Sequence, residues 1–307
     1  MQRHPRLDIQ KWVDEFSIWR RLPMVPVPGQ EVDDALSLDF WLARGAPVSS
    51  PYDLAVVEQV RRATELVASL GPPTPTDLFL MSPGPGEEPS LTRMGGVPHR
   101  PADQPWPTTE AGTPYTFVAQ FSFVDSQDLM HFELPGDLLL VYFAAPDSPM
   151  SASLPEGLYF EWQPAAIARP MRREQVPPPC MRVPELHAQI LRTAEYPKSY
   201  SVFAKSGFLE WWLFIKTQAT RIGGSTFFPN NDPRKVGLIS RDAEFLCSLN
   251  SVVPRTFPDM GPYPLVADRP LNLSREEAEA LSFLVGDNGC LYIFLDEEGV
   301  LHWQAHG

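Results

Sequence analysis

The stretch Thr92-Arg93-Met94-Gly95-Gly96 returns 128 positions later as Thr220-Arg221-Ile222-Gly223-Gly224. When the chain is shifted by this amount, without a gap from position 92 to 124, eight of 33 positions are identical. Ordinary residue usage would give about two identities over such a length. We therefore interpret the sequence as an internal duplication, a feature that decides the fold of a chain wherever it occurs.

Two further blocks extend the repeat. Residues 289–294 correspond to residues 137–143. Residues 300–304 correspond to residues 159–163, and these blocks contain Trp303-Gln304 and Trp162-Gln163 respectively. Each unit is thus predicted to hold a Gly-Gly turn, a proline-bearing loop, a strand, a variable connection and a hairpin that ends in Trp-Gln. Because each unit is too small to cover its own sheet face, we expect the two to pack about a pseudo-two-fold axis.

The spacing of apolar residues predicts both strands and helices. Alternation predicts strands at 76–81, 115–123, 138–143, 158–163, 244–249, 289–294 and 300–304, the last two joined by a hairpin turn at 296–299. Helices are predicted at 7–21, 51–70, 184–193 and 208–215, and a capping box at Ser274 with Glu277 begins a further helix that ends before Gly286. The 35 prolines disfavour long helical bundles. The predicted fold class is α+β.

We expect one compact body over residues 1–307. It divides into an N-terminal helical extension with the first strand (1–90), a first repeat unit (91–175), a helical connector (176–218) and a second repeat unit (219–307).

Net charge and hydropathy limit the kinds of partner and the cellular location that the sequence allows. A net charge of −13 argues against nucleic-acid binding, which requires clustered Lys and Arg. The acidic surface either keeps the protein soluble or faces a basic partner. The first residues lack the apolar core of a secretory signal, and no apolar run reaches the length of a membrane span. We therefore expect a cytoplasmic protein without a membrane partner.

Catalytic and metal-binding patterns are absent from the sequence. It contains no GxSxG, GxxxxGK[ST], GxGxxG or HExxH motif. The six histidines are scattered, and Cys180, Cys247 and Cys290 lack metal-ligand spacing, so free thiols are expected. We predict no catalytic residue, no metal and no cofactor, and non-enzymatic function is favoured over an enzyme.

Four residues are candidates for binding a ligand or partner. Arg93 and Arg221 each precede a Gly-Gly turn, where an arginine either binds an anion beside exposed N–H groups or fixes the turn through an internal carboxylate or carbonyl. Trp106, on a proline-rich loop, is either an exposed recognition residue or a lid over the core. Gln120 lies in an otherwise apolar strand and requires a buried partner or a pocket.

Several of these motifs together resemble the YwqG-like family, a bacterial domain of unknown function (domain of unknown function 1963), over about residues 75–307. The second unit departs from the pattern, with Ser248 at the position of Gln120 and without a Trp-Pro pair, so a ligand site shared equally by both units is in doubt. The motifs that carry the resemblance are Arg93-Met94-Gly95-Gly96, Pro101, Trp106-Pro107, Phe117-Val118-Ala119-Gln120, Val141-Tyr142-Phe143, Arg221-Ile222-Gly223-Gly224 and Gly289-Cys290-Leu291-Tyr292-Ile293-Phe294.

The resemblance implies an intracellular bacterial protein with an internally duplicated α+β fold and no established activity. It also implies an interaction or immunity role, because members are often encoded beside secreted toxins. The favoured function is a non-catalytic protein-binding module of the bacterial cytoplasm that engages another protein, either basic or a toxin. The alternative is a small-molecule binder or enzyme with a pocket between the two repeats.

Overall fold

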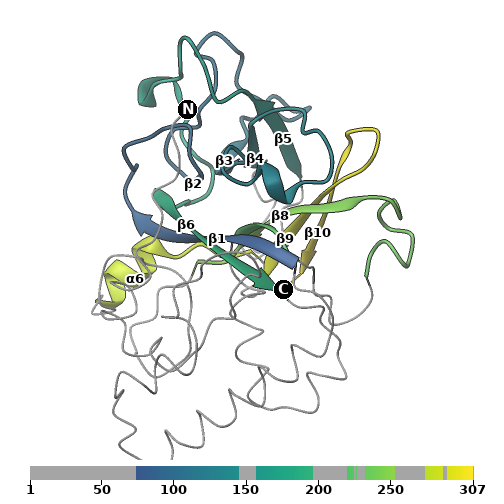
Figure 1. Ribbon diagram of the computed structural model, residues 1–307. Helices are drawn as coiled ribbons and strands as arrows, with labels where there is room; N and C mark the ends of the chain where they lie inside the picture. The colour runs from purple at the N-terminus through teal and green to yellow at the C-terminus, as the bar shows by residue number, and fades with distance from the viewer. Residues whose placement is uncertain are drawn as a thin grey trace, which may run out of the picture.

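The computed structural model describes residues 74–144, 157–195, 220–224, 226, 232–252, 274–285 and 289–306 (Figure 1). Within these residues the chain forms a strongly curved antiparallel sheet of ten strands. The strands are β1 Thr74–Pro83, β2 Arg93–Met94, β3 Thr116–Ser122, β4 Leu138–Phe143, β5 Leu158–Gln163, β6 Leu186–Glu195, β7 Arg221–Gly223, β8 Glu244–Asn250, β9 Cys290–Leu295 and β10 Leu301–His306. The α+β prediction is therefore wrong, because strands dominate the described part of the chain.

Helices are short in the same ranges. The predicted capping box is confirmed, because the Ser274 hydroxyl accepts from the Glu277 N–H and the Glu277 carboxylate accepts from the Ser274 N–H. The helix that it begins, α6 Arg275–Leu281, ends before Ser282, earlier than predicted. The helices predicted at 7–21, 51–70 and 208–215 lie outside the described residues.

The helix predicted at 184–193 is wrong, since residues 186–193 belong to β6 and the two before them are not helical. Leu186 and Ile190 are four residues apart, a spacing that suits one face of a helix and also one face of a strand. Ala188 between them is buried as well, which only the two-residue period explains. β6 pairs with β1 over ten residues, and these backbone bonds decide between the two periods. The predicted helical connector at 176–218 therefore contains a strand.

The strand order runs β10-β9-β8-β7-β1-β6-β2-β3-β4-β5. From one edge, the four strands of the second unit come first and β1 follows them. From the other edge, the four strands of the first unit come first and β6 follows them. β1 precedes the first unit but pairs with β7 of the second, whereas β6 precedes the second unit but pairs with β2 of the first. This order is the one that a two-fold axis between β1 and β6 would produce.

Local geometry repeats at the same spacing of 128 residues. The Thr92 hydroxyl accepts a hydrogen bond from the Ser122 N–H at 3.0 Å, and the Thr220 hydroxyl accepts one from the Asn250 N–H at 3.1 Å. The β3–β4 ladder shifts register between Phe117 and Ala119, and the β8–β9 ladder shifts at the equivalent positions, 245 and 247. The diglycines have positive φ in both units, a conformation that other residues resist.

The predicted match of Trp162-Gln163 with Trp303-Gln304 is wrong by two residues. Val141 pairs with Phe160, whereas its counterpart Ile293 pairs with Trp303. A slip of two residues keeps every side chain on the same face, so alternation in the sequence cannot detect it. Trp162 consequently corresponds to Ala305.

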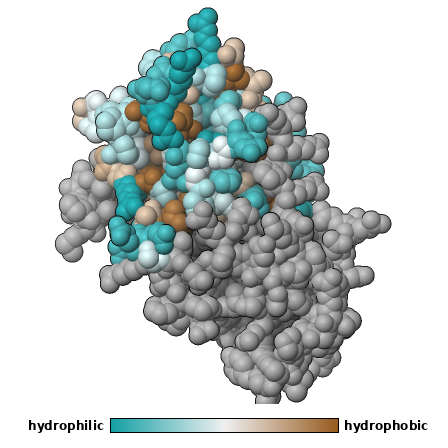
Figure 2. Space-filling view, turned by 90° about the vertical axis from the view of Figure 1, so that its left-hand side faces the viewer, coloured by the Kyte–Doolittle hydropathy of each residue, from teal (hydrophilic) through white to brown (hydrophobic). Residues whose placement is uncertain are grey.

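Both units contribute to the main core. Equivalent apolar residues from the two halves belong to one buried cluster, and the rings of Phe143 and Phe283 lie 6.1 Å apart across it. The view in Figure 2 shows one outer face on which hydrophilic residues predominate and apolar ones form small patches. The equivalent core pairs are Val118 and Leu246, Phe121 and Leu249, Leu139 and Leu291, and Val141 and Ile293.

A buried ion pair joins the two central strands. Asp77 on β1 lies directly opposite Arg192 on β6 and has no exposed surface. Its carboxylate accepts from the Arg192 guanidinium, at 2.8 Å for Nη2, and from the Ser126 hydroxyl at 2.7 Å. A buried carboxylate requires such partners, because removal from water is costly for an uncompensated charge.

Candidate functional site

Arg93 is buried at the junction of β2 with β3 and β6. Its guanidinium donates to the Glu88 carbonyl at 2.7 Å, and burial lowers its pKa. The Glu185 carboxylate lies against Gly96, close enough that a Cβ at position 96 would clash with its Oε1. The Glu185 carboxylate thus occupies the space beside the diglycine that an external anion would need. These contacts fit the turn-fixing role.

Among the residues that the structure describes, the Gln120 side chain bonds only to backbone groups. Its side-chain oxygen accepts from the His99 N–H at 2.8 Å, and its amide nitrogen donates to the carbonyls of Pro89 and Leu91 at 3.0 and 2.7 Å. It lies opposite Arg93 in the β2–β3 ladder, so the structure brings these two candidates together. Gln120 has no exposed surface, and its hydrogen bonds tie the segments at 89–91 and at His99 to the sheet.

Arg221 is equally inaccessible. It has no exposed surface, and its guanidinium carbon lies 5.4 Å from the centre of the Phe245 ring. Between its strand β7 and Arg93 on β2 lie β1 and β6. The structure does not bring the two arginines together.

Trp106 covers a second, smaller core on the face of the sheet opposite the main core. Its indole N–H donates to the Tyr115 carbonyl at 2.8 Å, and its ring is perpendicular to the Tyr142 ring, with the two ring centres 5.6 Å apart. Arg100 lies 5.4 Å from the centre of the Trp106 ring. The half-buried Trp106 therefore acts as a lid on the Phe117, Leu140 and Tyr142 cluster.

A buried polar network beneath this lid was missed by the sequence reasoning. Glu161 accepts hydrogen bonds from Arg100 at 3.1 Å, from the Tyr142 hydroxyl at 3.1 Å and from the Gln163 amide at 2.6 Å. Burial, with the nearby Glu161 charge, raises the pKa of Tyr142. The sequence does contain a signal for this network, because Glu161 is a polar residue inside an apolar strand, as Gln120 is. Since Arg100 and Glu161 are almost fully buried, this network stabilises the loop that carries Arg100 and is not accessible to a partner.

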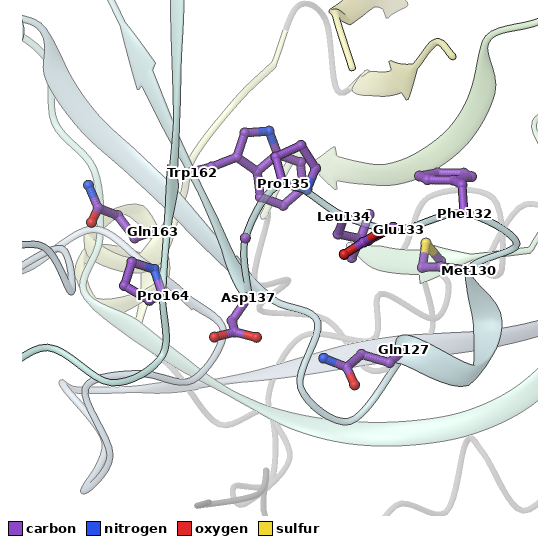
Figure 3. Close-up of a pocket in the computed structure, with 11 residues that line it drawn as sticks. Gln127, Met130, Phe132, Glu133, Leu134, Pro135, Asp137, Trp162, Gln163 and Pro164 are labelled. Carbon is purple, nitrogen blue, oxygen red and sulfur yellow. The ribbon is translucent and has the colours of Figure 1, made fainter. Parts of the chain in front are cut away.

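An open pocket of about 450 Å³ lies at the end of β5. The loop after the short 3-10 helix η3 Gln127–Leu129 forms one side, and the last residues of β5 form the other. Figure 3 shows the side chains arranged around the opening, with Trp162 and Pro135 on one side and Phe132 and Met130 on another. Its apolar lining consists of Met130, Phe132, Leu134, Pro135, Trp162 and Pro164.

Apolar residues of the pocket continue into the main core. Met130, Phe132, Leu134 and Trp162 all pack against the main core cluster while remaining partly exposed. The Trp162 ring lies 5.6 Å from the Phe123 ring, which holds one wall in place. The pocket therefore has a floor fixed by the core and an opening to solvent.

Polar groups of the pocket are acidic or neutral. Gln127, Glu133, Asp137 and Gln163 complete the lining. Asp137 is held in place because its Oδ2 accepts from the Ala165 N–H at 2.8 Å. The Trp162 indole Nε1 is shielded from solvent and has no hydrogen-bond partner among the residues that the structure describes. A buried donor of this kind is uncommon, because burial without a partner costs about 1–3 kcal/mol.

No group of three or more potential metal-ligating side chains occurs in the described ranges. His302 instead bonds Asp296 at 2.7 Å across the β9–β10 hairpin. No helix within those ranges is long and apolar enough to cross a membrane. The cysteines are free, as predicted; Cys247 and Cys290 are buried, whereas Cys180 is exposed.

Fold and site together define a duplicated antiparallel β protein with a pocket in its first unit. Residues 92–303 match the family described as Domain of unknown function (DUF1963), and the chain belongs to this family. The predicted membership in domain of unknown function 1963 is thereby confirmed. A comparison with curated proteins finds no match.

Proposed function

We propose that the protein is a non-catalytic protein-binding module that holds a segment of a partner protein in the pocket at the end of β5. The observation that carries this proposal is the pocket itself, about 450 Å³ in volume, with Met130, Phe132 and Trp162 partly exposed on a floor fixed by the core. Methionine and aromatic side chains are enriched at protein interfaces, where they bury large apolar areas. The site is cytoplasmic in this proposal, and a toxin is the type of partner that the family resemblance implies.

The contacts of the four sequence candidates support a site elsewhere than at those residues. Arg93 and Gln120 are buried and bonded to backbone, and Arg221 has no exposed surface. None of the four lines the pocket. A partner would therefore contact side chains that were not among the binding candidates.

Site-specific photo-crosslinking tests the proposal. A photoreactive phenylalanine analogue replaces Phe132, and a matched control carries it at Leu238, which is 73% exposed. In the native host, we expect one discrete adduct from position 132 and none from position 238, and Trp162→Ala should abolish the adduct. Equal labelling at both positions, or an adduct indifferent to Trp162, would refute the proposal.

A small ligand is the second candidate function, because the pocket volume falls within the range of about 300–1,000 Å³ typical of small-molecule sites. The pocket lies within the first unit, whereas the sequence had suggested one between the repeats. A low-molecular-weight compound that co-purifies with the wild type and is absent from Trp162→Ala would favour this function.

A further inference from the structure

The pocket at the end of β5 has a one-sided charge. The stretch from 125 to 137 contains four acidic residues, at 125, 128, 133 and 137, and no Lys or Arg. Glu133 and Asp137 line the pocket itself, and none of the lining residues that the structure describes is basic. Arg192 pairs with Asp128 outside the lining, so it does not neutralise the two lining carboxylates. A cation that approaches this opening is attracted by Glu133 and Asp137, and none of the described lining residues repels it.

The apolar wall carries one hydrogen-bond donor that the described residues leave unsatisfied. The indole Nε1 of Trp162 is shielded from water and has no partner among them. Because this nitrogen is shielded, an occupant of the pocket would meet the apolar ring of Trp162 and not its donor. A purely apolar occupant would leave the carboxylates of Glu133 and Asp137 without a partner, and these carboxylates would repel an anion (Figure 3).

The second unit does not repeat these chemical groups. By strand pairing, Ala305 stands at the position of Trp162, because Leu139 pairs with Trp162 and its counterpart Leu291 pairs with Ala305. By the same register, Gly289 stands in place of Asp137. The duplicated framework is therefore present twice, but the indole and the carboxylate are present in the first unit alone.

We infer that the occupant of the pocket is a peptide segment with an apolar side chain next to Lys or Arg, bound once per chain. The apolar side chain enters between Phe132 and Trp162, and the basic group lies at Glu133 and Asp137. This inference rests on the proposed function, because it names the chemistry of the partner at the same site.

Selection from a phage-displayed random heptapeptide library on the immobilised full chain tests this inference. We expect enriched peptides that place Lys or Arg beside a large apolar residue. Isothermal titration of the strongest should give one peptide per chain. Glu133→Lys should weaken its affinity at least about tenfold, whereas Glu297→Lys, the same charge change on an exposed turn of the second unit, should leave it unchanged. Trp162→Ala, which removes the apolar ring from the lining, should also weaken binding.

The outcomes separate this inference from the function on which it rests. Enriched peptides without basic residues that still require Trp162 would overturn the inference and leave the protein-binding function standing. Peptides whose affinity is unchanged by both Glu133→Lys and Trp162→Ala, or that bind twice per chain, would also overturn it. Failure to enrich any peptide, together with no photo-crosslink at position 132, would refute the proposed function as well.

Discussion

Replacing Gln120 with leucine should lower the free energy of unfolding by about 3 kcal/mol. The side chain makes three hydrogen bonds, of 2.8, 3.0 and 2.7 Å, each to a backbone group of another segment. A net contribution of about 1 kcal/mol per bond gives this value, and leucine fills a similar volume, so a cavity adds little. The buried His99 N–H would lose its acceptor, so the cost of losing that bond lies at the upper end of the usual range for one hydrogen bond.

Urea unfolding followed by tryptophan fluorescence provides the measurement, with the denaturant slope compared as a check on the unfolded state. Gln120→Glu should cost as much or more, because its second oxygen would face the Pro89 and Leu91 carbonyls that now accept hydrogen bonds. Gln175→Ala, at an exposed position, should change stability by less than about 0.5 kcal/mol. A loss below about 1 kcal/mol for Gln120→Leu would show that these loops do not depend on the side chain, and the reasoning would fail.

Three further predictions test the repeat, a buried titration and the thiols. Gly95→Ala should destabilise the protein by more than Gly223→Ala, because both positions have positive φ, a cost of about 1–2 kcal/mol, but a Cβ at 95 also clashes with the Pro184 carbonyl; equal shifts of the melting temperature would contradict this. Burial, with the nearby Arg93 charge, lowers the pKa of His99, so the unfolded chain takes up a proton that the folded one resists as the pH falls below about 6.5. Stability should thus fall between about pH 7.5 and 5.5 by more in the wild type than in His99→Gln, and identical losses in urea titrations would refute the assignment. A thiol-specific chromophore should modify Cys180 rapidly in the native protein and the two buried cysteines only after unfolding, since burial raises the pKa of the Cys247 thiol; three equally fast reactions would be inconsistent with the fold.

Most strands were predictable because their signal is local. The segments predicted at 138–143 and 158–163 coincide with β4 and β5. The Gly-Gly turns also follow from sequence, since positive φ at all four glycines is a property that this residue permits. β6 failed because its apolar spacing satisfies two periods, and only pairing with β1 selects one of them.

The candidate site was less predictable than the fold. Arg93 and Gln120 drew attention because polar residues in apolar surroundings require partners, and the structure supplies those partners from the chain itself. The pocket joins the loop after η3 with the end of β5, two segments that contain none of the four binding candidates. Their proximity follows from the β4–β5 pairing, which no local pattern specifies.

The sequence by itself determined that the chain is duplicated, where most of the strands run and that both diglycines form turns, because each depends on residues near one another along the chain. Only the tertiary structure decided that β1 and β6 cross to the opposite units, that Trp162 corresponds to Ala305, and that a pocket forms in one unit. Backbone hydrogen bonds between distant strands fix these features. Every residue has the carbonyl acceptor and every residue except proline has the N–H donor, so the choice of pairing partner leaves little signature in the side chains.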